Sequence, residues 1–200
     1  MTTARERIYG LFLTHPKDAW TQKDLAARAA CSRGYVSRVV DDLTTGGVLG
    51  RPYKNRVVLA GPAKLLTLWA SRRSLPRPVY VASSLRLEDA EALIGQAQGT
   101  AFTLFRAAWH RTKFMATSTL EAYALPDGLP GLVARLGSAS PEPTSILLYP
   151  AEGAEFEAAD VVDELPLVSV PQNVVDLIAL GGQGPRVALH LARAHGLWEA

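Results

Sequence analysis

The sequence contains very little of what a disulfide-bonded, metal-binding or membrane protein needs. Its 200 residues include a single cysteine, Cys31, which excludes a disulfide framework and any zinc site built from cysteines. No run approaches the roughly 18 consecutive apolar residues of a membrane-spanning helix, and the apolar stretch near the N-terminus is too short for a signal peptide. One cysteine fits a reducing compartment, so we expect a cytoplasmic protein with no membrane partner.

Signatures of catalysis are also scarce. No metal-ligand spacing relates the four histidines, His15, His110, His190 and His195, and there is no Gly-x-Ser-x-Gly motif. The glycine-rich stretch 181–184 follows a predicted helix, and no Lys-Ser or Lys-Thr pair comes after it. We interpret it as a helix-ending turn and not as a phosphate-binding loop. We therefore predict that the protein is not an enzyme, with no catalytic residue, cofactor or metal.

Acidic residues gather between positions 152 and 164. We interpret them as a solvated acidic loop, with a metal site and a surface for a basic protein partner as the alternatives. The members of this acidic segment are Glu152, Glu155, Glu157, Asp160, Asp163 and Glu164.

The net charge of +2 conceals an uneven distribution. Up to Arg77 the chain has 14 Lys and Arg against five Asp and Glu, a net charge of +9. The remainder has 7 basic and 14 acidic residues, a net charge of −7. Such asymmetry indicates an anionic partner for the basic part. The alternative is a basic surface that is only solvated.

The composition, 48% apolar and 20% charged, is that of a globular protein of one or two domains. Two prolines, Pro76 and Pro78, stand where the charge changes sign. Each favours extended backbone at the residue before it, so we expect no helix to cross this segment. We predict one domain over residues 1–75 and a second over residues 79–200.

The basic part has the pattern of three helices followed by a hairpin. Apolar spacing predicts helices over residues 3–14, 22–29 and 33–44, with Ile8, Leu11 and Phe12 on the inner face of the first. Thr21 and Ser32 are suitable N-caps for the second and third. Residues 48–51 and 56–59 read as strands joined by the cationic turn 52–55, and a further helix starts near Pro62. This order predicts a winged helix-turn-helix.

Residues 21–43, TQKDLAARAACSRGYVSRVVDDL, resemble the helix-turn-helix of bacterial transcription regulators. They depart from it at Ala30-Cys31, where many members have glycine and an aliphatic residue. The N-terminal end of a recognition helix enters the major groove of DNA, while hairpin cations contact phosphates or the minor groove. A winged helix used for protein contacts is the alternative. The predicted DNA-binding residues are Gln22, Lys23, Ser32, Arg33, Gly34, Tyr35, Ser37, Arg38, Arg51, Tyr53, Lys54, Asn55 and Arg56.

The acidic part mixes helical and strand patterns. We predict helices over 86–94, 102–111 and 129–136 and strands over 114–124, 145–149 and 165–170, followed by two helices around the 181–184 turn. The expected fold class is α+β, an N-terminal winged helix-turn-helix followed by a mixed α/β C-terminal domain.

Residues 103–109, residues 145–150 with Phe156, and above all LVSVPQNVVDLIALGGQG at 167–184 resemble the antitoxins of AbiE-type (type IV) toxin–antitoxin systems. The resemblance implies a repressor that binds inverted repeats in its own promoter. It also implies that the second domain counteracts a cognate nucleotidyltransferase-like toxin. The alternative is a one-component winged-helix regulator whose C-terminal domain binds a ligand or dimerises.

Overall fold

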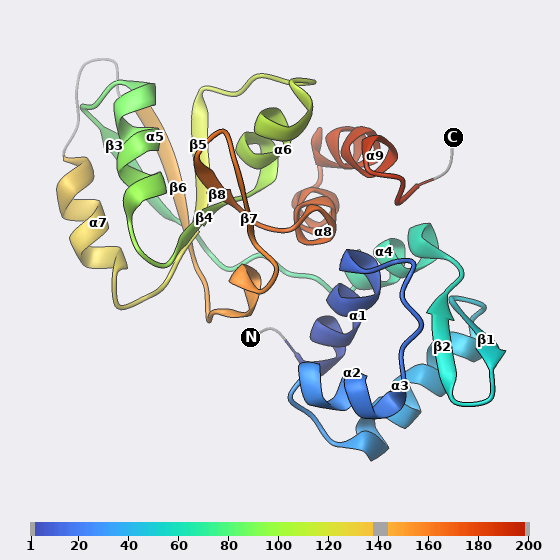
Figure 1. The fold of residues 1–200 in the computed structure, drawn as a ribbon. Helices are drawn as coiled ribbons and strands as arrows, with labels where there is room; N and C mark the ends of the chain where they lie inside the picture. The colour runs from blue at the N-terminus through green and yellow to red at the C-terminus, as the bar shows by residue number, and fades with distance from the viewer. Residues whose placement is uncertain (1–2, 138–143, 199–200) are drawn as a thin grey trace.

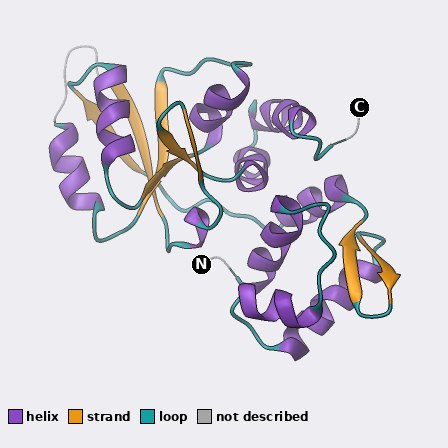
Figure 2. Ribbon diagram, in the orientation of Figure 1, coloured by secondary structure: helices purple, strands orange, loops and turns teal. Residues whose placement is uncertain are grey.

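Nine α-helices and eight β-strands make up the regular structure of residues 3–137 and 144–198, the residues that the computed structural model describes. The chain is therefore of the α+β class, as predicted. A mainly helical N-terminal part lies against a C-terminal part built on one large sheet (Figures 1 and 2).

Hydroxyl residues start the first three helices. The side chains of Thr3, Thr21 and Ser32 each accept a hydrogen bond from the backbone N–H three residues on, which satisfies a donor that the helix itself leaves unpaired. The predicted order of elements is observed. The elements are α1 (Ala4–Thr14), α2 (Gln22–Arg28), α3 (Arg33–Thr45), β1 (Leu49–Tyr53), β2 (Arg56–Leu59) and α4 (Pro62–Ala70).

Two details of this part differ from the sequence prediction. Tyr9 and Leu13 are fully buried on α1, whereas Leu11 is only half-buried, because α4 and α8 both pack on this helix. Strand β1 also continues through Pro52 to Tyr53, so the turn of the hairpin is only two residues long. The strand register shifts between Gly50 and Tyr53, which places the proline where no ladder hydrogen bond is required.

The hairpin is anchored to the segment before α2. Trp20 and Val57 exchange two backbone hydrogen bonds of 2.9 Å each. Both side chains are buried. This pairing holds the base of the hairpin beside the start of α2, a contact that local sequence patterns do not indicate.

The C-terminal part contains a six-stranded mixed sheet in the order β3-β6-β5-β4-β8-β7. The pairs β5–β6 and β4–β8 are parallel, and the other neighbours are antiparallel. The elements are β3 (Val79–Ser83), α5 (Leu87–Gln96), β4 (Thr100–Phe102), α6 (Leu104–Thr112), β5 (Thr119–Ala124), α7 (Leu129–Leu136), β6 (Thr144–Pro150), the 3-10 turn η1 (Ala154–Phe156), β7 (Asp160–Val162), β8 (Leu165–Leu167), α8 (Val170–Leu180) and α9 (Gly184–Ala194).

Several boundaries in this part were predicted wrongly. The helix expected over 102–111 starts only at Leu104, after the short strand β4, and the strand expected over 114–124 is confined to β5. Residues 165–170 form a strand for only three residues before α8 begins. Strands β3, β4 and β7 were not predicted at all. Strands this short form because a neighbour in the sheet pairs with them. The apolar pattern within such a strand does not predict this pairing.

The two faces of the sheet carry different helices. Phe102, Leu120 and Ile146 lie on the face that packs against α5 and α7. Ala101, Tyr123 and Tyr149 lie on the opposite face and belong to the cluster that includes α6, α8 and α9.

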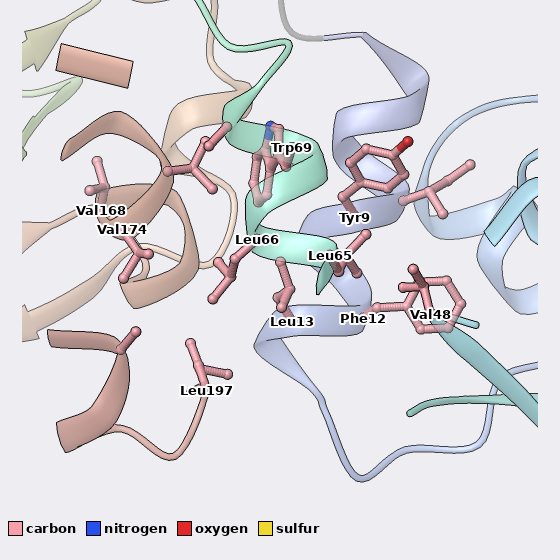
Figure 3. Close-up of a cluster of buried hydrophobic side chains, with 14 of the residues drawn as sticks. Tyr9, Phe12, Leu13, Val48, Leu65, Leu66, Trp69, Val168, Val174 and Leu197 are labelled. Carbon is pink, nitrogen blue, oxygen red and sulfur yellow. The ribbon is translucent and has the colours of Figure 1, made fainter. Parts of the chain in front are cut away.

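This second cluster extends without interruption into the N-terminal part. Figure 3 shows Leu66 and Trp69 of α4 beside Val174 of α8 and Leu197 near the C-terminus. The segment 71–78 between the two parts contains no helix or strand. The division into domains at residues 75 and 79 stays a prediction, and the shared cluster means that the two parts are packed together. Among the described residues no helix combines the length and the apolar character needed to cross a membrane.

Candidate nucleic-acid interface

The turn between α2 and α3 aims the start of α3 outward. Ala30 has a φ of +48°, which a non-glycine residue adopts at a cost of about 1 kcal/mol or more. Cys31 N–H donates to the Ala26 carbonyl over 3.0 Å and closes the turn. Small side chains at both positions therefore permit the turn without the usual glycine.

Burial separates the two faces of α3. Val36, Val39, Val40 and Leu43 are all buried, as their spacing predicts. Arg33, Gly34 and Arg38 are exposed on the opposite side, whereas Tyr35 and Ser37 are half-buried. The first turn of α3 is thus accessible to a partner.

One open depression collects predicted residues from three elements. Its walls are the start of α2, the start of α3 and the hairpin, with Trp20, Thr21 and Val57 forming the rest of the lining. Sequence reasoning did not assign Thr21 to this surface. The predicted residues that the fold brings together here are Gln22, Lys23, Arg33, Arg51, Lys54, Asn55 and Arg56.

Some cations of this depression have partners within the protein, and others do not. Arg51 pairs with Asp41 of α3 over 2.5 Å, and an Arg56 nitrogen donates to the Ala19 carbonyl over 2.9 Å. Lys23, Arg33 and Lys54 form no ion pair within the described part of the chain. These three exposed cations therefore have no acidic partner among the described residues and can each pair with an external phosphate.

The remaining predicted residues lie outside the depression. Arg38 stands 5.7 Å over the ring of Tyr35, and the Gln22 amide reaches Ser37 at 3.5 Å. The Ser32 hydroxyl is occupied in capping α3. Tyr53 is 68% exposed near the tip of the hairpin. These residues are placed beside the depression, along the outer face of α3 and the hairpin.

The most important residue that sequence reasoning misplaced is Arg73. Its charge is part of the net +9 of the basic part, yet its side chain is only 5% exposed. It donates to Asp176 over 2.9 Å and to the Tyr123 hydroxyl over 2.8 Å. Burial alone would lower the pKa of Arg73, but Asp176 and Tyr123 outweigh it and raise that pKa above its usual value. The sequence contains one indication of this pair: Asp176 is a single acid inside an apolar helical run, and a buried acid needs a partner.

The acidic segment 152–164 is not a solvated loop throughout, which corrects the prediction. Glu155 is buried and lies 3.6 Å from Arg73. Asp160 pairs with Arg111 of α6, and Asp163 contacts both His110 and Lys113. These pairs tie the β7 edge to α6. Across residues 3–137 and 144–198 no group of three or more His, Cys, Asp or Glu side chains is arranged to hold a metal.

Comparison with protein-family models, curated proteins and solved structures finds no match for this chain. The resemblance to AbiE-type antitoxins therefore stays a prediction.

Proposed function

We propose that this protein binds double-stranded DNA through a winged helix-turn-helix in residues 1–75 and represses transcription. The observation that carries the proposal is the depression in which α2, α3 and the hairpin together present Lys23, Arg33 and Lys54 beside an exposed helix start. Three separate elements converge on one cationic surface. Solubility alone does not require that arrangement.

In this proposal each element has a distinct task. The first turn of α3 enters the major groove, where Arg33 and Arg38 read guanine edges. Lys23, Lys54 and the hairpin contact the phosphate backbone and set the register. The exposed ion pair between Arg51 and Asp41 links the hairpin to α3.

Arg33→Ala and Arg38→Ala are expected to weaken binding to a duplex from the promoter of its own operon. The loss is about 1–3 kcal/mol for each arginine that contacts a guanine bidentately. Fluorescence anisotropy with promoter and scrambled duplexes measures it, and the promoter should lose more than the scrambled duplex.

Lys54→Ala provides the contrast in the same titration. A lost phosphate contact weakens both duplexes alike and lowers the slope of log affinity against log salt by about one. If none of the three variants changes the titration, the assignment of this surface to DNA is wrong, and a winged helix used for protein contacts takes its place.

Gly34→Ala separates DNA contact from folding. A Cβ at Gly34 would have no atom within 4 Å, so the protein itself does not require glycine there and the variant should be at least as stable. If α3 approaches the duplex closely, the added methyl lowers affinity about tenfold, or about 1.4 kcal/mol. Gly131→Ala on α7 is the matched control, because its Cβ also meets nothing within 4 Å. Equal affinities for the two variants would contradict close approach at Gly34.

The resemblance to AbiE-type antitoxins adds a second role to the proposal. The acidic C-terminal part would then counteract a nucleotidyltransferase-like toxin encoded next to this gene. Co-expression with such a neighbour tests this role, because an antitoxin restores growth and a one-component regulator does not. The DNA experiments above do not depend on the outcome.

A further inference from the structure

A second depression lies between α1, α3 and the segment that follows α4. It has a volume of about 440 Å³, which is within the range of sites for small organic molecules. The residues that line it include Thr3, Arg5, Tyr9, Tyr35, Arg72 and Ser74. This depression is separate from the one assigned to DNA, since the two have no lining residue in common.

The hydroxyl of Tyr9 gives this depression its clearest chemical signal. Tyr9 is fully buried, and its hydroxyl has no hydrogen-bond partner among the described residues. In Figure 3 the hydroxyl oxygen points away from Trp69, the ring that packs edge-on against Tyr9 at 6.5 Å. A buried polar group without a partner destabilises the folded protein. An acceptor atom bound in the depression would remove that destabilisation.

Two arginines supply positive charge at the same place. Arg72 is exposed and forms no ion pair within the described chain. Arg5 contacts the exposed Asp42 of α3 over 3.0 Å. Arg5 lines the depression together with Tyr9 and Tyr35.

The one carboxylate in this depression is already occupied. Glu6 accepts the Thr3 N–H over 2.6 Å and the Trp69 indole N–H over 3.3 Å, and it lies 3.9 Å from Arg73. The lining of the depression holds three arginines, Arg5, Arg72 and Arg73, against this one carboxylate, so cations outnumber acids there.

We propose that this depression binds an oxyanion, a phosphate or carboxylate group, through Arg5, Arg72 and the hydroxyl of Tyr9. Guanidinium groups match the planar oxygens of such anions, and the Tyr9 hydroxyl donates to a third oxygen. The volume leaves room for an organic body beyond the anionic group. The oxyanion comes either from a free small molecule or from the DNA backbone.

An anion bound in this depression would act on α3 directly. An anion that draws Arg5 away from Asp42 leaves an unpaired negative charge on the helix assigned to DNA, and it adds negative charge beside Tyr35. DNA affinity then falls when a free anion binds. This consequence rests on the proposed DNA-binding function, whereas the binding of the anion does not.

The first experiment uses no DNA. Calorimetry and thermal unfolding of the full chain with phenyl phosphate and with inorganic phosphate should show binding and a raised midpoint of unfolding. Tyr9→Phe removes only the unpartnered hydroxyl, so the variant should fold with equal or greater stability and bind about tenfold more weakly. Arg72→Gln should show a similar loss. Arg77→Gln, an exposed arginine of the same segment outside the depression, should bind as the unaltered protein does.

The second experiment identifies the source of the oxyanion. If the DNA backbone supplies it, Tyr9→Phe and Arg72→Gln weaken duplex binding in buffer without added phosphate. If a free molecule supplies it, phenyl phosphate lowers the DNA affinity of the unaltered protein and not that of Tyr9→Phe. The proposal is overturned if neither phosphate binds and duplex affinity is unchanged in both variants. Arg33→Ala together with Arg38→Ala should lose DNA and keep phenyl phosphate, which separates failure of the two proposals.

Discussion

Arg73→Met is expected to lower the free energy of unfolding by about 3–5 kcal/mol, because it leaves buried carboxylates without their partner. For a chain of this size such a loss lowers the midpoint of thermal unfolding by roughly 10 °C. Asp176, which is completely buried, loses a hydrogen bond of 2.9 Å, and Glu155 loses a contact of 3.6 Å. Urea unfolding followed by circular dichroism measures the change.

The location of Arg73 gives this prediction a second consequence. The residue follows α4, while Tyr123 lies on β5 and Asp176 on α8. Glu6 of α1 lies at 3.9 Å. The guanidinium therefore connects the N-terminal part with the sheet and its covering helix, and the variant should also make the packing between the two parts less stable.

Two further variants serve as controls. Arg77→Met replaces an exposed arginine of the same segment and should change stability by less than about 0.5 kcal/mol. The double variant Arg73→Met with Asp176→Asn removes the uncompensated charge and should recover about 1–3 kcal/mol. Equal stability of Arg73→Met and Arg77→Met would show that the buried network does not stabilise the fold.

Glu121→Gln is expected to remove a pH dependence of stability that the unaltered protein has between about pH 4.5 and 7. Glu121 is 4% exposed on β5, and its carboxylate accepts the Arg106 N–H at the start of α6 over 2.9 Å. Burial raises its pKa to about 7, against the opposing effect of the helix N–H groups and of Arg106. Glutamine retains an acceptor oxygen and carries no charge to bury.

The sign of this effect follows from proton binding in the two states. The ordinary pKa of the unfolded side chain is 4.5, so between 4.5 and about 7 the folded protein binds the extra proton. Proton binding by Glu121 in the folded state contributes up to about 3 kcal/mol to the free energy of unfolding. This contribution is complete below pH 4.5 and is lost as the pH rises through about 7. Stability of the unaltered protein should fall relative to Glu121→Gln between pH 5 and pH 8.

An exposed acid provides the matched control for this experiment. The Glu88 side chain is 71% exposed, so Glu88→Gln should follow the pH profile of the unaltered protein. Urea unfolding at a series of pH values compares the three proteins. Parallel profiles for all of them would contradict a buried, protonated Glu121.

Sequence reasoning succeeded best where structure depends on neighbours in the chain. The N-caps Thr21 and Ser32 and the buried stripe on α3 were predictable because capping and helical periodicity involve residues no more than seven positions apart. The same local patterns predicted the helices and the hairpin that carry the proposed DNA-binding side chains. They did not show that seven of these side chains surround one depression, because this requires the hairpin to be anchored through Trp20 and Val57.

The amino-acid sequence by itself determined the α+β class, the order of helices and hairpin in the N-terminal part, and the cationic character of that part. Only the tertiary structure decided which charges face solvent. Arg73 and Asp176 are 103 positions apart, and the three-residue strand β7 exists because β8 pairs with it. The physical reason is that the cost of burying a charge depends on the partner that folding brings to it, and no local pattern records that partner.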